Sequence, residues 1–273
     1  VRNVEKKEKL TKPDLPFDLT TLQRECNKYF GFSAKQTLDY AQSLYEKKMI
    51  TYPRTDSRYL SEDMIINTVN NILGKNDFDT GRIKTVFNSK KVTDHHAIIP
   101  TVSSLSEDLS GIPESEAKVY RLISNKLHAS VGYPLVENTT KIVAEFDGFQ
   151  FTSTGKVIKD EGFTKYLKEY KFNKNEDLEL PDVSIGDVII IENKEIKEKY
   201  TKPPKHFTED TLLKAMELAG NDALEKGVEV EREGLGTPAT RAGIIENLIY
   251  KEFIERDKKN LIATLKGKSL IES

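Results

Sequence analysis

The chain has 273 residues, 37% of them hydrophobic and 32% charged, which is enough apolar material for one large domain or two to three small ones. Its 42 Lys and Arg residues against 44 Asp and Glu residues give a net charge of −2, which excludes a strongly basic, histone-like nucleic-acid binder. No apolar run approaches the roughly 18 residues of a membrane-spanning helix, so we expect no membrane partner.

The chain divides into three segments at positions where its composition and residue pattern change. Residues 1–134 begin with a polar lead-in over 1–16 and carry a net charge of +3. Residues 135–199 and 200–273 together carry −5, and paired prolines near the second cut favour an extended connection.

Two helices are predicted in the first segment. Asp18 or Thr20 can cap the first helix, and Ser33 caps a second that ends near 47–48. With a short strand expected at 49–52, this outline indicates a winged helix-turn-helix, although an ordinary helical hairpin explains the pattern better on its own.

The middle segment reads as an antiparallel sheet. Apolar and polar residues alternate over 140–146, 149–157 and 183–192, which predicts three strands. Asp147-Gly148 is a hairpin signal between the first two.

The last segment returns to helices, which begin at Thr208 and at Thr237-Pro238. The predicted fold class is therefore α+β and multidomain. It comprises a helical, winged-helix-like domain (1–134), a β-rich segment (135–199) and a helical segment (200–273).

The densest group of reactive side chains follows the second helix, where a proline favours extended backbone. Alternate side chains of an extended chain share a face, so Tyr52, Arg54 and Asp56 are expected on one face. Thr55 and Ser57 are then expected on the opposite face.

A tyrosine beside an arginine suits phosphoryl chemistry, because the guanidinium can hold a phosphate while the phenolate oxygen attacks phosphorus. Phenols are weak acids, so a positive group such as Arg54 would be needed to provide phenolate at neutral pH. Two alternatives remain. Tyr52 could have a purely structural role, as most of the 11 tyrosines must, and Arg54 and Asp56 could form a surface ion pair.

A second cluster surrounds the adjacent pair His95-His96. Neighbouring side chains on a strand face opposite ways, so the two histidines are not expected to hold one metal together. One of them could bond a phosphate oxygen, and a structural histidine is the alternative.

A third cluster runs from Glu233 to Ala242. Its glycines precede a capped helix whose free backbone N–H groups can bind phosphate, and Thr237, Thr240 and Arg241 add donors on the first turn. The Gly-Lys-Ser/Thr of a P-loop is absent, and a merely well-capped helix explains the pattern equally well.

Taken jointly, the three clusters resemble the type IA DNA topoisomerases, and the match runs through nearly all of the chain. The form of the tyrosine motif and the histidine pair look more like topoisomerase III than topoisomerase I. The matching segments are Leu15-Pro16-Phe17, Thr21-Leu22-Gln23, Gly31-Phe32, Ala41 to Glu46, Ile50 to Ser57, His95 to Pro100, Lys202-Pro203-Pro204 and Gly234 to Thr240.

The resemblance implies a role for each matching residue. Tyr52 would cut one DNA strand and become linked to its 5′-phosphate, Arg54 would clamp the scissile phosphate, and His95 would hydrogen-bond near it. The DNA-contacting residues would be Arg54, His95, His96, Thr237, Thr240 and Arg241. A phosphotyrosine link conserves the energy of the broken phosphodiester, so resealing needs no ATP.

The family's Mg²⁺ site lies in a Toprim domain, and its acidic Asp-x-Asp-x-Glu cluster is missing from this sequence; the nearest run, Asp77 to Gly81, lacks the final acid. We therefore expect no metal ligands in this chain. We expect the chain to be the tyrosine-bearing part of a longer enzyme, inactive or nearly so alone, with single-stranded DNA and the Toprim domain of the same full-length chain as its partners.

Two other functions compete with this interpretation. A rolling-circle nickase also uses a tyrosine, but it needs two histidines separated by one apolar residue, and His95-His96 lacks that spacer. A non-catalytic clamp for single-stranded DNA remains open. The single cysteine, Cys26, and the absence of a signal peptide favour a cytoplasmic location.

Overall fold

The computed structural model describes residues 1–74, 78–106, 108–170, 178–220 and 234–272. Its strands and α-helices are β1 (Asn3–Thr11), α1 (Leu19–Phe30), α2 (Ala34–Glu46), α3 (Ile65–Asn67), α4 (Thr80–Val86), α5 (Glu114–Ser130), β2 (Leu135–Phe146), β3 (Phe149–Asp160), β4 (Phe207–Thr208), α6 (Glu209–Leu218), α7 (Pro238–Tyr250), β5 (Ile254–Asp257), β6 (Asn260–Ala263) and α8 (Leu265–Glu272). The remaining elements are short 3₁₀ and π turns at Glu62–Met64, Thr68–Leu73, Ser89–Lys91, Val102–Ser106, Leu109–Gly111 and Gly162–Tyr170.

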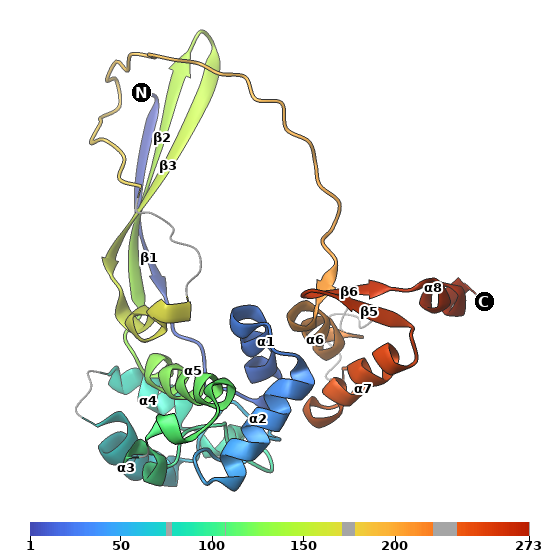
Figure 1. Cartoon of the computed structure of the whole chain (residues 1–273). Helices are drawn as coiled ribbons and strands as arrows, with labels where there is room; N and C mark the ends of the chain where they lie inside the picture. The colour runs from blue at the N-terminus through green and yellow to red at the C-terminus, as the bar shows by residue number, and fades with distance from the viewer. Residues whose placement is uncertain (75–77, 107, 171–177, 221–233, 273) are drawn as a thin grey trace.

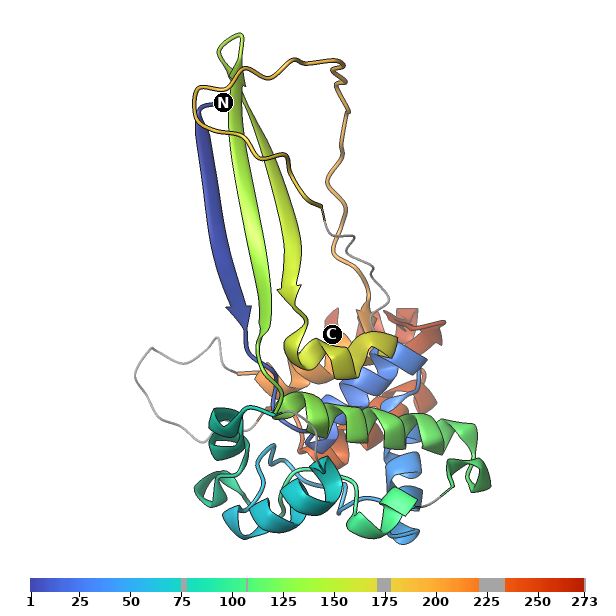
Figure 2. The same ribbon diagram turned by 90° about the vertical axis from the view of Figure 1, so that its left-hand side faces the viewer.

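The molecule consists of a helical body, a long sheet and a second helical part. The sheet of β1, β2 and β3 extends away from the body that holds α1 to α5, and α6 and α7 lie beside α1 and α2 (Figure 1). The quarter-turn view shows the same sheet as a narrow arm above α5 (Figure 2). The mixture of helices and sheets confirms the predicted α+β class.

Both helices predicted near the N-terminus form as expected. Asp18 caps α1, where its carboxylate accepts the backbone N–H of Thr21 at 2.7 Å, and Gly31 ends the helix with a φ of 73°. Ser33 caps α2. Their inner faces pack against α5 in a core whose fully buried members include Leu22, Leu44, Leu122 and Ile123.

The strand expected at 49–52 is reduced to one bridge, between Ile50 and Pro100. The bridge consists of two backbone hydrogen bonds, from the N–H of Thr51 to the carbonyl of Ile99 at 2.9 Å and from the N–H of Thr101 to the carbonyl of Met49 at 3.0 Å. Pro53 has no N–H to donate, so it cannot add the next hydrogen bond of the ladder.

The sheet has the order β1-β2-β3, and both pairs are antiparallel. The hairpin predicted at Asp147-Gly148 is confirmed, with φ values of 51° and 80° that suit a two-residue turn.

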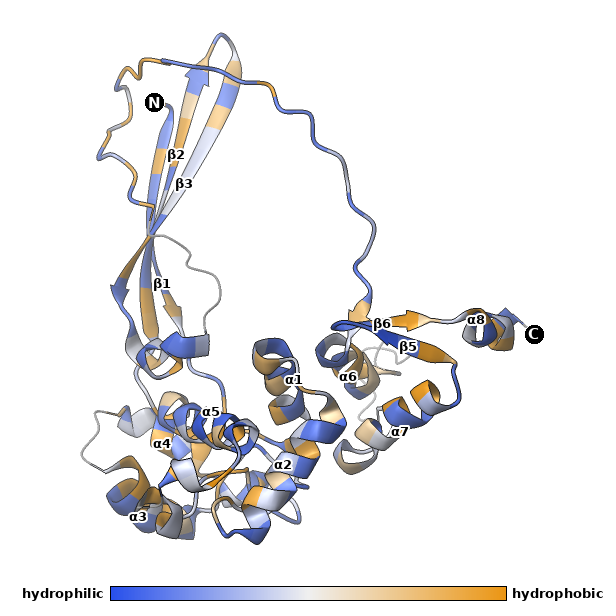
Figure 3. Cartoon of the chain, viewed as in Figure 1, coloured by the Kyte–Doolittle hydropathy of each residue, from blue (hydrophilic) through white to orange (hydrophobic). Residues whose placement is uncertain are grey.

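Two sequence-based expectations about this sheet are wrong. The polar lead-in is strand β1, which pairs with β2 along its whole length, whereas 183–192 forms no strand. Because β1 already occupies the edge of β2, the alternating residues of 183–192 have no ladder to join there, and Val188 is 92% exposed. Figure 3 shows these apolar residues along the extended segment that leads back to β4.

The C-terminal part begins as predicted, with Thr208 capping α6 and Thr237 capping α7. It meets α2 through a small apolar cluster of Ala34, Leu213, Met216, Ala242 and Ile245. The segment boundaries after 134 and 199 stay predictions. Within the described part of the chain, no helix combines the length and apolar character needed to cross a membrane.

Candidate functional site

The stretch after α2 bends at Thr51 and Pro53 and forms neither helix nor strand around Tyr52, but the exposure of its side chains alternates. Thr55 and Ser57 are each 3% exposed, whereas Arg54 and Asp56 are exposed and Tyr52 is half-buried. The alternation of buried hydroxyls with exposed charges therefore separates the two faces as expected.

Thr55 connects this stretch to two others. Its hydroxyl donates to the backbone carbonyl of His95 at 2.8 Å and accepts the N–H of Ser57 at 3.1 Å. Its own carbonyl accepts the N–H of Leu19, the first residue of α1, at 3.0 Å. The sequence predicts Thr55 on the face opposite Tyr52 but does not predict these hydrogen bonds, because the partner of a hydroxyl depends on tertiary contacts.

Tyr52 lies against His95, with ring centroids 4.5 Å apart, and against Tyr45 of α2, with centroids 5.4 Å apart. Tyr45 is 39% exposed, so the contact with Tyr52 leaves part of its ring open to solvent.

The two histidines do differ in environment. His95 is exposed beside Tyr52, whereas the half-buried His96 has its Nδ1 atom 2.8 Å from the carbonyl of Ala97. Of the pair, His95 is therefore the one that the structure places next to the tyrosine.

A pocket of about 160 Å³ brings the three sequence clusters together. It is lined by Arg54, Thr55, Asp56, Asp94 and His95 from the tyrosine body and by Thr237, Pro238 and Ala239 from the start of α7. Larger pockets, of about 530 and 470 Å³, lie along the sheet and beside β5 and β6, away from these residues.

Some of the hydrogen-bond donors at the start of α7 already bond groups within the helix cap. The hydroxyl of Thr240 accepts the N–H of Thr237 at 2.8 Å and donates to its carbonyl at 3.2 Å, which forms the N-terminal cap. Thr237 and Thr240 are both exposed, and Glu233 lies outside the described residues.

Arg241 lies in a different environment from its neighbours. It is 5% exposed and does not line the pocket. Its Nε donates to the carbonyl of Leu235 at 3.2 Å, and its Nη1 donates to the hydroxyl of Thr20 at 3.0 Å.

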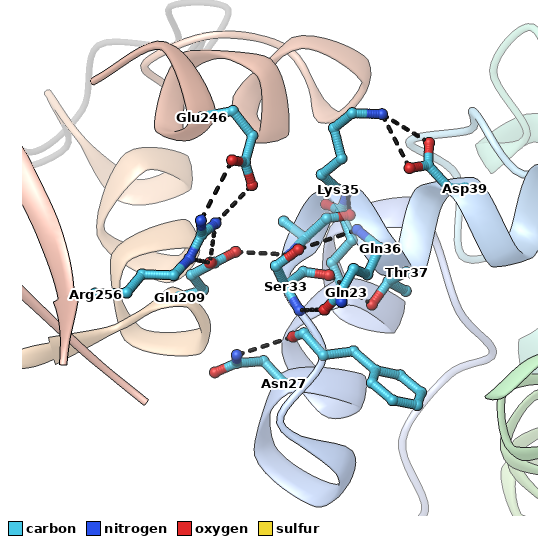
Figure 4. Close-up of polar contacts among 12 residues, drawn as sticks. Gln23, Asn27, Ser33, Lys35, Gln36, Thr37, Asp39, Glu209, Glu246 and Arg256 are labelled. Carbon is cyan, nitrogen blue, oxygen red and sulfur yellow. Dashed lines mark hydrogen bonds and ion pairs between the residues drawn. The ribbon is translucent and has the colours of Figure 1, made fainter. Parts of the chain in front are cut away.

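A second polar junction joins the two helical parts farther from the tyrosine. The Glu209 carboxylate accepts the N–H of Ala34 at 2.6 Å and the Nη2 of Arg256 at 2.7 Å, and Arg256 also pairs with Glu246. Figure 4 shows this group of contacts beside Ser33 at the start of α2.

The described residues do not assemble a metal site, since no three His, Cys, Asp or Glu side chains gather in a suitable arrangement among them. Asp77 lies outside the described residues, and Asp79 caps α4 by accepting the N–H of Gly81 at 2.8 Å.

The sequence profile of the DNA topoisomerase family matches residues 1–273. The chain is 39% identical to DNA topoisomerase 3 of Bacillus licheniformis, over 94% of this chain and 38% of that protein. It is 36% identical to DNA topoisomerase 3 of Vibrio cholerae, over 95% of this chain and 42% of that protein.

The fold also resembles that of a solved structure, full-length topoisomerase I from Thermotoga maritima. The TM-score is 0.70 at 26% identity, with 99% of this chain and 44% of that chain covered. The chain thus spans about two fifths of the length of the proteins that it matches.

Proposed function

The chain belongs to the type IA DNA topoisomerase family and is most like bacterial DNA topoisomerase III, and from this premise we propose that it carries the strand-cleaving tyrosine of such an enzyme. The observation that supports the proposal most directly is the position of Tyr52, which touches His95, while His95 and Arg54 line one pocket with Thr237.

In the proposed reaction, the phenolate oxygen of Tyr52 attacks the phosphorus of a single DNA strand. A Tyr–O–P bond forms at the 5′-phosphate, the P–O3′ bond breaks, and the leaving 3′-oxygen takes up a proton. The same 3′-hydroxyl attacks the phosphotyrosine after strand passage and restores the phosphodiester, so no ATP is consumed.

Arg54 and His95 would hold the phosphate during this exchange. The exposed Arg54 lines the pocket and can donate two hydrogen bonds to phosphate oxygens, which stabilises charge that builds up as the P–O3′ bond breaks. His95 lies against the tyrosine ring and can donate a third hydrogen bond.

Thr237, which lines the other side of the pocket, and Thr240, which lies in the first turn of α7, would contact the DNA strand, and both are exposed. His96 is a weaker candidate, because its ring is half-buried and its Nδ1 atom lies beside the carbonyl of Ala97.

We further propose that Mg²⁺ is held by a Toprim domain of a longer polypeptide that contains this chain. The chain's share of its relatives' length leaves room for such a domain, and its own described residues provide no comparable acidic cluster. The chain alone should therefore bind single-stranded DNA weakly and should not relax supercoiled plasmid.

The test is to mix the chain with a separately produced Toprim domain, Mg²⁺ and a single-stranded oligonucleotide, and to trap covalent adducts with denaturant. Wild-type chain should form an adduct only with both additions, and Tyr52→Phe should form none.

Efficient plasmid relaxation by the chain alone would contradict the dependence on Toprim, and an adduct that survives Tyr52→Phe would contradict the nucleophile. Equal DNA binding by both proteins, with no adduct under any condition, would instead support a non-catalytic clamp.

A further inference from the structure

Arg241 is a buried cation that joins the two helical parts near the tyrosine. Its guanidinium spans two acceptors, the carbonyl of Leu235 in its own part and the hydroxyl of Thr20 in α1. Leu235 is 62% exposed, whereas Thr20 is 1% exposed, so the hydrogen bond at the α1 end of this bridge is shielded from solvent. A hydrogen bond from a charged donor in such a place is stronger than one at the surface.

On the α7 side, Arg241 holds a tightly packed turn. The N–H of Leu235 donates to the carbonyl of Met216 at 2.7 Å, which fixes the turn to the end of α6. Gly236 has a φ of 68°, and a Cβ atom there would lie 2.8 Å from Ile244 and 3.5 Å from Cγ of Arg241. The turn that leads directly into Thr237 therefore packs tightly against Ile244 and also contacts the Arg241 side chain.

On the α1 side, the bridge leads to the tyrosine stretch. Thr20 follows Leu19, whose N–H bonds the carbonyl of Thr55, and the hydroxyl of Thr55 bonds the carbonyl of His95. Arg241 is thus connected through α1 to the residues that line the opposite wall of the pocket.

We propose that Arg241 is a positioning residue, which fixes the start of α7 against the tyrosine stretch by bonding Thr20 and makes no contact with DNA. The inference rests on the proposed function, because what it positions is the Thr237 wall of the cleavage pocket. A small displacement of reacting groups can cost about 100-fold in rate, so this bridge should affect cleavage more than binding.

The first experiment measures adduct formation by the chain with Toprim domain and Mg²⁺, at saturating and at limiting single-stranded DNA. Arg241→Met and Thr20→Val should each slow adduct formation at saturating DNA about tenfold or more, with the DNA dissociation constant changed less than about twofold. The double variant should be no slower than the slower single variant, because both changes break one bridge.

Conservative variants separate a positioning role from a charge role. Thr20→Ser keeps the hydroxyl and should restore the rate, whereas Arg241→Lys keeps the charge but cannot reach both acceptors and should stay slow. Arg24→Ala is a matched control, because it breaks a different cross-part ion pair, to Asp210 at 2.8 Å, and should leave the rate unchanged.

A direct contact with DNA would give the opposite pattern: Arg241→Met would weaken DNA binding, Arg241→Lys would restore it, and Thr20→Val would have no effect. A loss of rate in Arg24→Ala equal to that in Thr20→Val would show that any loosening of the interface suffices. Either result overturns the proposal.

A second readout needs no cleavage and uses the chain alone. Spin labels at the exposed positions Lys90→Cys and Asn247→Cys report the distance between the two parts, since Cys26 is buried. The distance distribution should broaden in Arg241→Met and Thr20→Val and stay narrow in Thr20→Ser.

Distributions as narrow as wild type in all three variants would overturn the proposal. Absence of an adduct from unmodified chain would count against the proposed function instead.

Discussion

At the residue scale, Asp18 carries a carboxylate that is 5% exposed at the start of α1. Burial raises the pKa of Asp18 above its ordinary value of 3.8, although hydrogen bonds from Thr21 act in the opposite direction. A carboxyl whose folded pKa is raised stabilises the fold below its unfolded pKa, and this contribution is lost as pH rises through the folded pKa. Ionisation of the buried Asp18 carboxyl therefore lowers the stability of the fold.

Asp18→Asn should be more stable than wild type at pH 7, because an amide oxygen can still accept the N–H of Thr21 without a buried charge. Its advantage should grow as pH rises from about 3.8 through the raised pKa of the native carboxyl. Denaturant unfolding of both proteins between pH 4 and 7 measures this difference, with Asp18→Ala expected to lose about 0.5–2 kcal/mol with the cap. A constant difference across the pH range would argue against the buried charge.

The sequence was sufficient to predict which residues gather around the pocket, but not which groups they bond. The motif order was enough to single out Tyr52, Arg54, His95 and Thr237, which the structure brings together. It could not separate Arg241 from its exposed neighbour Thr240, because one helical step decides whether a side chain faces solvent or the opposite helix.

At the element scale, the four helices that the sequence predicts all form, whereas α3, α4, α5 and α8 were not predicted. A helix is determined by local signals, so the caps at Ser33 and Thr208 located the beginnings of α2 and α6. A strand needs a partner from elsewhere in the chain, and alternation does not name that partner. Accordingly, the charged residues 3–11 pair with β2, whereas the more apolar residues 183–192 form no strand.

Gly155 shows how the segment after β3 is fastened to the sheet. A Cβ atom at this position would lie 2.5 Å from the carbonyl oxygen of Leu178 and 2.6 Å from Leu180. Leu178 exchanges two backbone hydrogen bonds with Lys156 at that point, of 2.9 and 3.1 Å.

Gly155→Ala should therefore detach the segment at Leu178 while the β2–β3 hairpin remains paired. Hydrogen exchange at the Leu178 amide should become at least about tenfold faster, given about 1 kcal/mol for each hydrogen bond lost. Ser153→Ala, at an exposed position of the same strand, is the matched control and should leave exchange unchanged. Unaltered protection of the Leu178 amide in Gly155→Ala would contradict the claim that close packing at Gly155 holds the segment against β3.

At the scale of the whole molecule, the two helical parts meet through few apolar residues and several buried polar contacts. Glu209 is 3% exposed and neutralises Arg256 while accepting the first N–H of α2. Removing one partner of a buried pair leaves the other groups unsatisfied.

Glu209→Ala should cost about 1–3 kcal/mol of unfolding free energy, because the buried N–H of Ala34 loses its acceptor while the 33% exposed Arg256 keeps Glu246. Denaturant unfolding gives the value, and hydrogen exchange at the Ala34 amide should reveal local opening. Glu255→Ala, at an exposed position of β5, should change stability by less than about 0.5 kcal/mol. Equal stability of the two variants would mean that Glu209 does not hold the parts together.

The central claim is that Tyr52 becomes linked to the 5′-phosphate of a cleaved strand. An oligonucleotide with different labels at its two ends, trapped with the chain, Toprim domain and Mg²⁺, tests it most directly. We expect that the protein-linked piece keeps the label of the 3′ end, that the free piece ends in a 3′-hydroxyl, and that mass spectrometry finds the DNA on the peptide containing Tyr52. Retention of the 5′-end label, or a nucleotide on any other tyrosine, would contradict it.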